Sequence, residues 1–199
     1  MQIVVFTNNQ NKIKEIEHVF KIKEIEIFPY LRVFKEKIDV VEDGFTFEEN
    51  VRKKIAVFKE HKNRIFLADD SGLEVDVLDG RPGIYSARYA GENATSNQMC
   101  EKLLDEMRGK ENRMANFICT LALKLPNGKL KIVVGKVFGQ IIQEMRGQHG
   151  FGYDPVFKPD GCDFTFAEMK LGEKNKISHR ARALQKALEE IKCYLRVGV

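Results

Sequence analysis

The sequence predicts an α/β fold, with a mixed, mostly elongated β-sheet flanked by helices and two lobes with an active-site cleft between them. Strand-like and helix-like segments alternate through the first half of the chain, a hairpin pattern follows, and the chain ends in a clearly amphipathic helix. The 199 residues, 43% of them hydrophobic, suffice to bury one substantial core. The sequence has no repeat, low-complexity tract or Pro/Gly/Ser-rich linker, so we expect residues 1–199 to form a single domain.

Short apolar runs predict the strands of the first half of the chain. Ile3 to Phe6 is expected to form a buried strand, and Glu24 to Phe28 a second strand. Ile65 to Ala68 is expected to form a third buried strand that stops at the polar segment 69–72. Beyond that segment, alternation predicts a separate half-buried strand through Leu73, Val75 and Val77. Acidic side chains are therefore expected where a strand stops.

Helical spacing of apolar residues predicts the helices. The helix that follows the first strand is expected to bury Ile13, Ile16 and Phe20. A second helix is expected from about Phe47 to Lys59, and a third from Thr95 to Met107.

The second half of the chain adds a hairpin and a last helix. Asn116 to Lys124 and Lys129 to Phe138 are expected to pair around the turn Pro126-Asn127-Gly128. The last helix has Ser178 available as its N-cap and buries one stripe, which consists of Ile177, Ala181, Leu184, Leu188 and Ile191. A hairpin beside alternating strands and helices predicts a mixed sheet.

Composition limits the classes of partner. Lys and Arg number 33 against 29 Asp and Glu, a far smaller excess than duplex-DNA binders usually carry, so the balance suits a small anionic ligand at least as well as a polymer. The four cysteines are widely separated and have no zinc-site spacing, which indicates reduced, mostly structural thiols. The apolar run at the N-terminus is too short for a signal peptide or a membrane span, so we expect a cytoplasmic protein with no membrane partner.

The segment Thr7-Asn8-Asn9-Gln10-Asn11-Lys12 follows the first predicted strand and leads into the first predicted helix. Free backbone N–H groups and the positive end of the helix dipole favour a phosphate at such a place, and Lys12 adds a charge. The alternative is an ordinary N-cap loop followed by a solvated lysine, because the segment is not a GxxxxGKT loop.

Two acidic segments could bind Mg²⁺ or activate a water molecule. Asp69-Asp70-Ser71-Gly72 places a carboxylate pair and a hydroxyl after a buried strand, where open α/β sheets build their sites. Turn chemistry is the alternative, but it does not explain two adjacent acids after four apolar residues. In the segment 42–50, Glu42 adds a hard oxygen ligand, and Asn50 and Lys54 share one helix face. Good helix-start chemistry at Thr46 explains that second segment equally well.

Two further groups could hold a base. The segment 150–155 places Phe151 and Tyr153 among glycines, so a ring face could be offered for stacking; a tight turn with buried aromatics is the alternative. Lys174, His179 and Arg180 offer several donors near the start of the last helix. Basic residues there oppose the helix dipole, which favours an anionic or carbonyl-bearing ligand over a solvated helix end.

Together these segments resemble the inosine triphosphate pyrophosphatase family, in order and over nearly the whole chain. The matching parts are Thr7-x-Asn9-x-x-Lys12-x-x-Glu15, Glu42-x-Gly44-x-Thr46-Phe47-x-Glu49-Asn50 with Lys54, Asp69-Asp70-Ser71-Gly72-Leu73, Pro82-Gly83-Ile84-Tyr85-Ser86-Ala87-Arg88-Tyr89, Phe151-Gly152-Tyr153-Asp154-Pro155 and Ser178-His179-Arg180. Each part alone is a weak signal, but six in order are specific.

The resemblance implies hydrolysis of ITP, dITP and XTP to the monophosphate and pyrophosphate, in a homodimer. It implies that the segment 7–12 grips the triphosphate, with Ser71 and Lys54 near the phosphates. Glu42 and Asp70 would bind Mg²⁺, and Asp70 would also accept the proton of the attacking water. The purine would be enclosed by Phe151, Gly152, Tyr153, Asp154, Lys174, His179 and Arg180.

The chemistry predicted for such a site is phosphoryl transfer by positioning and charge stabilisation, with Asp70, Lys12 and Lys54 as catalytic groups. Donors facing the 6-oxo group of the purine would reject the 6-amino group of adenine. Two alternatives remain. One is a different Mg²⁺-dependent triphosphatase that releases orthophosphate, and the other is a nucleotide- or RNA-binding module without turnover.

Overall fold

The computed structural model describes residues 2–20, 25–34, 38–58 and 64–197. Their elements, in chain order, are β1 (Gln2–Phe6), α1 (Gln10–Val19), β2 (Glu26–Pro29), α2 (Tyr30–Phe34), α3 (Phe47–Ala56), β3 (Arg64–Val75), η1 (Asp76–Leu78), η2 (Gly83–Arg88), α4 (Ser96–Glu106), β4 (Met114–Lys124), β5 (Leu130–Ile141), β6 (Phe157–Pro159), η3 (Phe166–Glu168), α5 (Leu171–Ile177) and α6 (His179–Val197). The η elements are short 3₁₀ helices.

The strands form one six-stranded sheet in the order β2-β1-β3-β4-β5-β6. β1 runs parallel to both β2 and β3, with Val4 opposite Phe28 on one side and opposite Phe66 on the other. β5 and β6 are antiparallel. The sheet is therefore mixed and flanked by helices, as the sequence predicts.

The chain forms two compact units. Unit 1 comprises Met1–Asp70, Cys119–Gly135 and Arg180–Val199, and unit 2 comprises Ser71–Ile118 and Lys136–His179. The long strands β3, β4 and β5 each contribute residues to both units.

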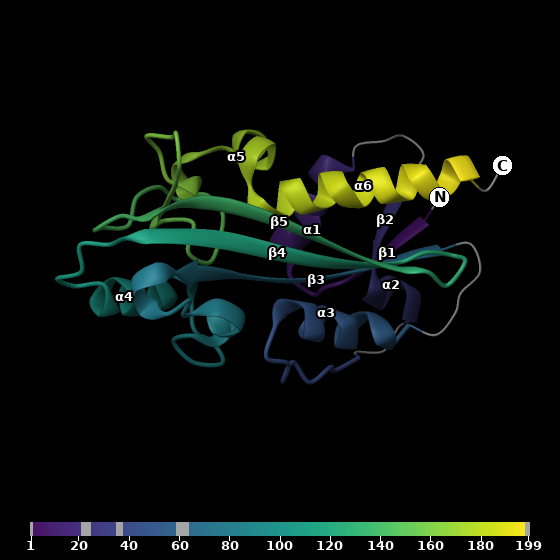
Figure 1. The fold of residues 1–199 in the computed structure, drawn as a ribbon, viewed down its shortest axis with the longest axis horizontal. Helices are drawn as coiled ribbons and strands as arrows, with labels where there is room; N and C mark the ends of the chain where they lie inside the picture. Colours follow the sequence, from purple (N-terminus) through teal and green to yellow (C-terminus); the bar gives the residue numbers. More distant parts are fainter. Residues whose placement is uncertain (1, 21–24, 35–37, 59–63, 198–199) are drawn as a thin grey trace. The chain divides into compact units, whose positions relative to one another are not determined.

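Unit 1 has a buried cluster on each face of its strands. Along β1, Ile3 and Val5 pack with α1 and α6, whereas Val4 packs with α2 and α3. The alternation follows from the two-residue period of a strand, which sends successive side chains to opposite faces. Figure 1 shows α6 along one face of the sheet and α3 along the other. Polar residues on these strands therefore have two distinct environments available.

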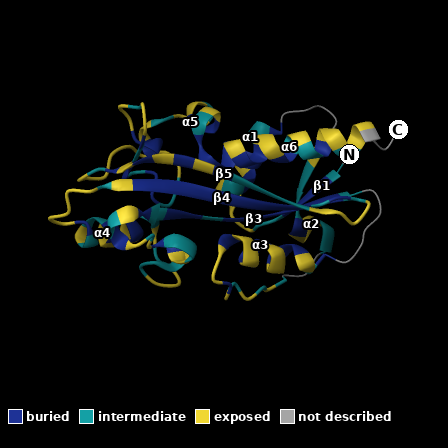
Figure 2. Ribbon diagram, in the orientation of Figure 1, coloured by how far each residue is buried: buried dark blue, intermediate teal, exposed yellow. Residues whose placement is uncertain are grey.

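Unit 2 has a single larger cluster, built from the ends of β3, β4 and β5, from α4 and from the aromatic residues of segment 153–166. Phe117, Phe157 and Phe166 contact one another, with ring centroids 4.7 to 6.0 Å apart. Figure 2 shows β3 and β4 buried along most of their length. Continuous burial of a strand means that both of its faces are covered.

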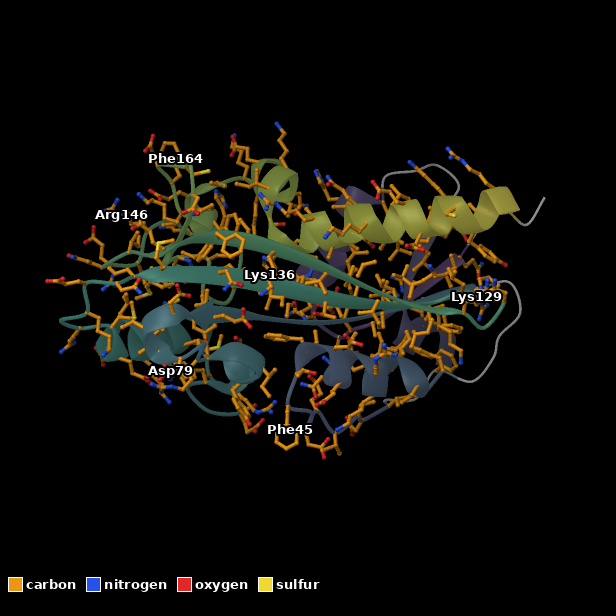
Figure 3. The ribbon with its side chains drawn as sticks, viewed as in Figure 1. Phe45, Asp79, Lys129, Lys136, Arg146 and Phe164 are labelled. Atoms are coloured by element: carbon orange, nitrogen blue, oxygen red, sulfur yellow. The ribbon has the colours of Figure 1, made fainter. Side chains whose placement is uncertain are left out.

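Several predicted elements are confirmed. The turn between β4 and β5 is closed by the Gly128 N–H, which donates to the carbonyl oxygen of Leu125 at 2.9 Å, and Lys129 lies at this turn (Figure 3). Thr95 caps α4 through a capping box with Gln98. The strand expected from Glu24 to Phe28 is β2, and the helix expected from Phe47 to Lys59 is α3; Glu24 and Lys59 lie outside the described residues.

The predicted break at Asp69 is wrong. β3 continues from Arg64 to Val75 without interruption, so Asp69 and Asp70 lie inside the strand and Val77 lies in η1. Local turn propensity is overridden because both carboxylates are buried against basic side chains, which compensates the cost of keeping charge in a strand.

The predicted last helix is divided. Ile177 ends α5, Ser178 is extended, with φ −66° and ψ 156°, and α6 begins at His179. The short elements α2, β6 and α5 were not predicted, because each is too short to show a period. Within the described residues, no helix combines the length and apolarity needed to cross a bilayer.

Glycines shape the loop between β5 and β6. Gly150 has φ +75°, and a Cβ atom there would lie 2.0 Å from Oδ2 of Asp154. Gly152 has φ +63°, but a Cβ atom there would meet nothing within 4 Å. The first glycine is therefore required for both its backbone conformation and the close approach of Asp154, the second for its conformation alone.

We expect Gly150→Ala to lower the free energy of unfolding more than Gly152→Ala does. Both changes impose left-handed strain of about 1–2 kcal/mol, but Gly150→Ala also displaces the Asp154 carboxylate from its hydrogen bonds, an added loss of about 1–3 kcal/mol. Denaturant titrations of the two variants measure the difference. Equal destabilisation would show that the contact with Asp154 is unimportant.

Candidate functional site

A pocket of about 300 Å³ lies within unit 1 and collects residues from β1, α1, α3, β3 and the segment 38–42. Its lining residues are Phe6, Thr7, Asn8, Asn9, Lys12, Tyr30, Ile38, Asp39, Val40, Glu42, Lys54 and Asp69. Most of the predicted phosphate segment therefore lies beside Glu42 and Lys54. Gln10 and Asn11 begin α1 and are exposed, and they are not among the lining residues.

The predicted phosphate segment is ordered by its own hydrogen bonds. Asn9 caps α1, and its Oδ1 accepts from the N–H groups of Asn11 (2.9 Å) and Lys12 (3.3 Å). Oγ1 of Thr7 accepts from the Asn9 N–H, and Asn8 donates to the Tyr30 hydroxyl. The expectation of free backbone N–H groups is therefore wrong for these two positions, because the Asn9 side chain satisfies them. The Lys12 ammonium, which lines the pocket, is the positive charge that the segment can offer a phosphate.

Asp69 is buried on the face of β3 that packs against α1 and α6. Its Oδ2 lies 2.8 Å from the Lys12 Nζ and 3.4 Å from Nη2 of Arg180. Arg180, 2% exposed, also forms an ion pair with the buried Glu15 of α1. This network links β3 to both helices of that face.

Asp70 points to the opposite face of β3, toward α3. Its Oδ1 lies 3.1 Å from Nζ of Lys54, and its Oδ2 accepts a hydrogen bond from Nδ2 of Asn50 at 3.2 Å. Two neighbouring acids thus have separate sets of partners, because successive residues of a strand face opposite ways.

The two environments move the acids' pKa values in opposite directions. Burial alone would raise the pKa of Asp69, but the charges of Lys12, Arg180 and Lys54 outweigh it and hold that pKa well below its ordinary value. For Asp70 burial dominates and raises the pKa, although Lys54 and Lys12 oppose it. A pair of acids with divergent pKa values is a common arrangement where one of them exchanges a proton.

Lys54 lines the pocket and connects it to Asp70, which is not among the lining residues. Its Nζ lies 2.8 Å from Oε2 of Glu42 and 3.1 Å from Oδ1 of Asp70, and it donates to the Asp69 carbonyl oxygen. Burial would lower the pKa of Lys54, but the nearby carboxylates of Asp70, Asp69 and Glu42 raise it, so the ammonium stays charged. Glu42 and Asp70 therefore already converge on one cation.

The donor set of Glu42 and Asp70 fits Mg²⁺, which prefers one or two carboxylates together with substrate phosphate and water. Among the described residues, no group of three or more His, Cys, Asp and Glu is arranged to hold a metal.

Unit 2 brings together part of the predicted base-binding group. Lys174 of α5 lies 2.6 Å from Oδ2 of Asp154, which also accepts from the Phe151 N–H at 2.9 Å. The Lys174 ammonium lies 4.9 Å from the centre of the Phe151 ring. Phe151 is partly exposed, so its ring can contact a ligand.

Other predicted residues of unit 2 have internal partners. Tyr153 belongs to the buried cluster, and its hydroxyl donates to the Ser86 carbonyl oxygen at 2.9 Å. The Gly152 N–H donates to Oγ of Ser96. Tyr153 is thus the buried aromatic residue of a tight turn, which was the alternative to base stacking. Phe151 is partly exposed, as a ring that stacks on a base must be.

Three more of the predicted site residues are His179, Ser71 and Arg180. His179 begins α6 and stacks on Phe117 with ring centroids 4.7 Å apart. Ser71 follows Asp70 in β3 and is partly exposed. Arg180 has Glu15 and Asp69 as partners, which gives it a structural role that the sequence argument disfavoured. The positive charge of Arg180 is tolerated at the N-terminal end of α6 because two buried carboxylates face it.

Two residues of these networks were missed as site residues. Asn50 was noticed for sharing a helix face with Lys54, and that spacing was the available signal. Glu15 was only part of a matched motif, yet an acid beside Ile16 on the apolar side of α1 indicates a buried partner.

We expect Asp69→Asn to lower the free energy of unfolding more than Asp70→Asn does at pH 7 in metal-free buffer. Asp69→Asn breaks a buried ion-pair network, a loss of typically about 3–5 kcal/mol. Asp70→Asn also breaks an ion pair, with Lys54, but it removes a charge that burial disfavours, so its loss is smaller.

The pH dependence separates the two effects. The pKa of Asp69 is lower in the folded protein than in the unfolded chain, where it is about 3.9. The Asp69 carboxylate therefore stabilises the fold fully above about pH 3.9, and this stabilisation is lost as the pH falls through the folded pKa. The unfavourable contribution of the Asp70 charge in the wild type is absent below about pH 3.9 and complete only above the raised folded pKa. Denaturant titrations between pH 3 and 9 measure both, and an equal loss for the two variants at pH 7 would contradict the assignment.

Comparison with known proteins agrees with the motifs. The sequence model of the Ham1 family matches residues 3–190. A dITP/XTP pyrophosphatase from Desulfotalea psychrophila is 47% identical over 182 residues, covering 92% of this chain and 81% of that protein. A dITP/XTP pyrophosphatase from Bacillus subtilis is 44% identical over 188 residues, covering 93% and 94%.

Solved structures give the same answer. The Ham1 protein of Staphylococcus aureus superposes with a TM-score of 0.84 at 37% identity, and the match covers 100% of both chains. The family match extends over nearly the whole chain, and the identity to both of these relatives exceeds 40%. The resemblance stated from the motifs is confirmed: the chain belongs to the Ham1 family.

Proposed function

We propose that this protein hydrolyses non-standard purine nucleoside triphosphates, ITP, dITP and XTP, to the monophosphate and pyrophosphate. The observation that carries the proposal is the unit 1 pocket, in which Lys54 and Glu42 lie beside Thr7, Asn8, Asn9 and Lys12. Two ammonium groups suit a polyphosphate, and carboxylates with a bound cation suit its cleavage. The names of the relatives, dITP/XTP pyrophosphatase, support the same substrates.

Asp70 is the base in this proposal, and Asp69 is an anchor. The raised pKa of Asp70 brings it nearer to what a proton acceptor needs, whereas Asp69 is held ionised by Lys12 and Arg180. Asp70 takes the proton as the water oxygen bonds to the α-phosphorus. The bond from that phosphorus to the bridging oxygen breaks, and pyrophosphate leaves. Lys12 and Lys54 stabilise the charge on the phosphate oxygens.

Glu42 and Asp70 are the residues that would hold Mg²⁺, because both already contact one cation, the Lys54 ammonium. The metal would supply neutralisation of phosphate charge and polarisation of the scissile phosphate. Lys54 must then give up at least part of its carboxylate contacts, which leaves its ammonium available to the substrate.

Base selection rests on donors in unit 2. Lys174 lies over Phe151, so one residue can stack with a purine while the other donates to its 6-oxo group. Adenine carries a 6-amino donor there and would leave the ammonium unsatisfied. His179 is a second donor in this proposal, whereas Arg180 acts through Asp69.

The remaining parts of the proposal concern context. We infer that residues 1–199 act as one functional domain, on free nucleotides rather than nucleic acid, in the cytoplasm and as a homodimer. A modest excess of Lys and Arg, 33 against 29 acidic residues, supports a small anionic substrate. Light scattering of the purified protein in solution measures its molar mass and so its oligomeric state.

We expect the protein with Mg²⁺ to release pyrophosphate from ITP and XTP much faster than from ATP, because adenine carries a 6-amino group where hypoxanthine and xanthine carry a 6-oxo group. Separate assays for pyrophosphate and orthophosphate identify the bond that breaks. Orthophosphate as the first product would favour the other class of triphosphatase, and binding without turnover would favour a nucleotide-binding module. Equal rates with ATP and ITP would remove the selective role.

We expect Lys54→Met to lower kcat for ITP by about 10²–10³-fold, the usual loss when one charge-stabilising group is removed. Lys53→Met is the matched control, because Lys53 is adjacent on α3 but pairs with Asp43 at the exposed surface. It should stay within about twofold of the wild type, as expected for an exposed ion pair. Similar losses in both variants would mean that Lys54 has no special role. Thermal unfolding of each variant separates loss of fold from loss of chemistry.

A further inference from the structure

Asn50 of α3 lies between Asp70 and the segment that carries Glu42. The residue is 1% exposed. Its Nδ2 donates to Oδ2 of Asp70 at 3.2 Å, and its Oδ1 accepts from the N–H of Gly44 at 2.8 Å. Both ends of the amide are therefore engaged, one with β3 and one with the loop before α3.

These two bonds fix the orientation of the Asp70 carboxylate. The Gly44 N–H can only donate, so it requires the amide oxygen, and the Nδ2 donor must then face Asp70. With Oδ2 held by Asn50, the other oxygen, Oδ1, faces the Lys54 ammonium at 3.1 Å. The carboxylate thus presents a defined oxygen to the cation that it shares with Glu42.

The loop approaches α3 closely at Gly44. A Cβ atom there would lie 2.7 Å from Oδ1 of Asn50 and 2.8 Å from Cβ of Glu49. Gly44 is two residues from Glu42, so its hydrogen bond to Asn50 sets where the Glu42 backbone lies relative to Asp70. One buried amide therefore constrains both carboxylates that contact Lys54.

We propose that Asn50 is a positioning residue for the reaction, holding Asp70 and the Glu42 loop in the arrangement that receives the cation and aligns the water. The inference rests on the proposed pyrophosphatase function. It assigns Asn50 no contact with substrate. Removal of such a group beside a metal ligand typically costs about 10–100-fold in metal affinity or activity.

Asn50→Leu tests the role with a side chain of similar size and no charge. We expect kcat for ITP to fall by about 10–100-fold, while KM, set by the phosphate and base contacts, changes little. Calorimetric titration of nucleotide-free protein with Mn²⁺ should show a comparable loss of affinity. An unchanged kcat and an unchanged Mn²⁺ affinity in the folded variant would overturn the inference.

Asn50→Asp separates positioning from simple loop anchoring. The variant keeps an oxygen for the Gly44 N–H but places a second carboxylate against Asp70. If Asn50 only anchored the loop, this variant would retain wild-type turnover; we expect at least a tenfold loss of kcat at saturating Mg²⁺. Asn116→Asp is the control for charge at a buried asparagine, because Asn116 lies in β4 in unit 2 and is 8% exposed. We expect it to retain turnover.

The double swap Asn50→Asp with Asp70→Asn tests the contact itself. Exchanging donor and acceptor restores the hydrogen bond, so the double variant should unfold at a higher temperature than Asn50→Asp alone. It should nevertheless stay inactive, because the proposed base is gone. This comparison, together with Asn50→Leu, keeps the inference testable even if Asn50→Asp folds poorly. An unfolding temperature no higher than that of the single variant would contradict the contact.

The outcomes distinguish the inference from the proposed function. If Asp70→Asn is inactive but Asn50→Asp and Asn50→Leu keep wild-type turnover, the positioning role is wrong and the proposed function stands. If the wild type releases no pyrophosphate from any purine triphosphate, the proposed function is wrong, and the positioning role toward this reaction is lost with it.

Discussion

Two neighbouring carboxylates, Asp69 and Asp70, are buried inside β3, and a carboxylate stays ionised in such a place only when positive charge or hydrogen-bond donors face it. The alternation of the strand sends them to opposite faces. Each face must therefore supply its own donors, and this requirement determines which polar residues the surrounding helices carry.

The two networks fix the elements of unit 1 differently. On one face, Arg180 joins Glu15 and Asp69, so residues from α6, α1 and β3 meet in one buried cluster. On the other, Asn50 and Lys54 of α3 meet Asp70. The first network holds its carboxylate ionised at all ordinary pH values, whereas the second leaves Asp70 with a raised pKa. The proposed base therefore lies on the face opposite the network that holds Asp69 ionised.

The proposed chemistry follows from this division. The pocket in unit 1 is lined by the ammonium groups of Lys12 and Lys54, which suit a polyphosphate. Lys54 also lies between the carboxylates of Glu42 and Asp70, where a metal cation is proposed. Unit 2 carries a separate arrangement, with the buried pair Lys174–Asp154 beside a partly exposed ring. In the proposed function, phosphate recognition and base recognition therefore belong to different parts of the chain.

The sequence by itself determined the types of most long elements, the hairpin around Gly128 and the family resemblance, because period, turn chemistry and motif order are local properties. Tertiary structure alone decided that β3 continues through Asp69 and Asp70, since their burial is compensated by residues such as Arg180, 111 positions away. It also decided the role of Asn50, whose partners lie 6 and 20 positions away on different elements. Such pairings depend on which faces pack together, and no local pattern contains that information.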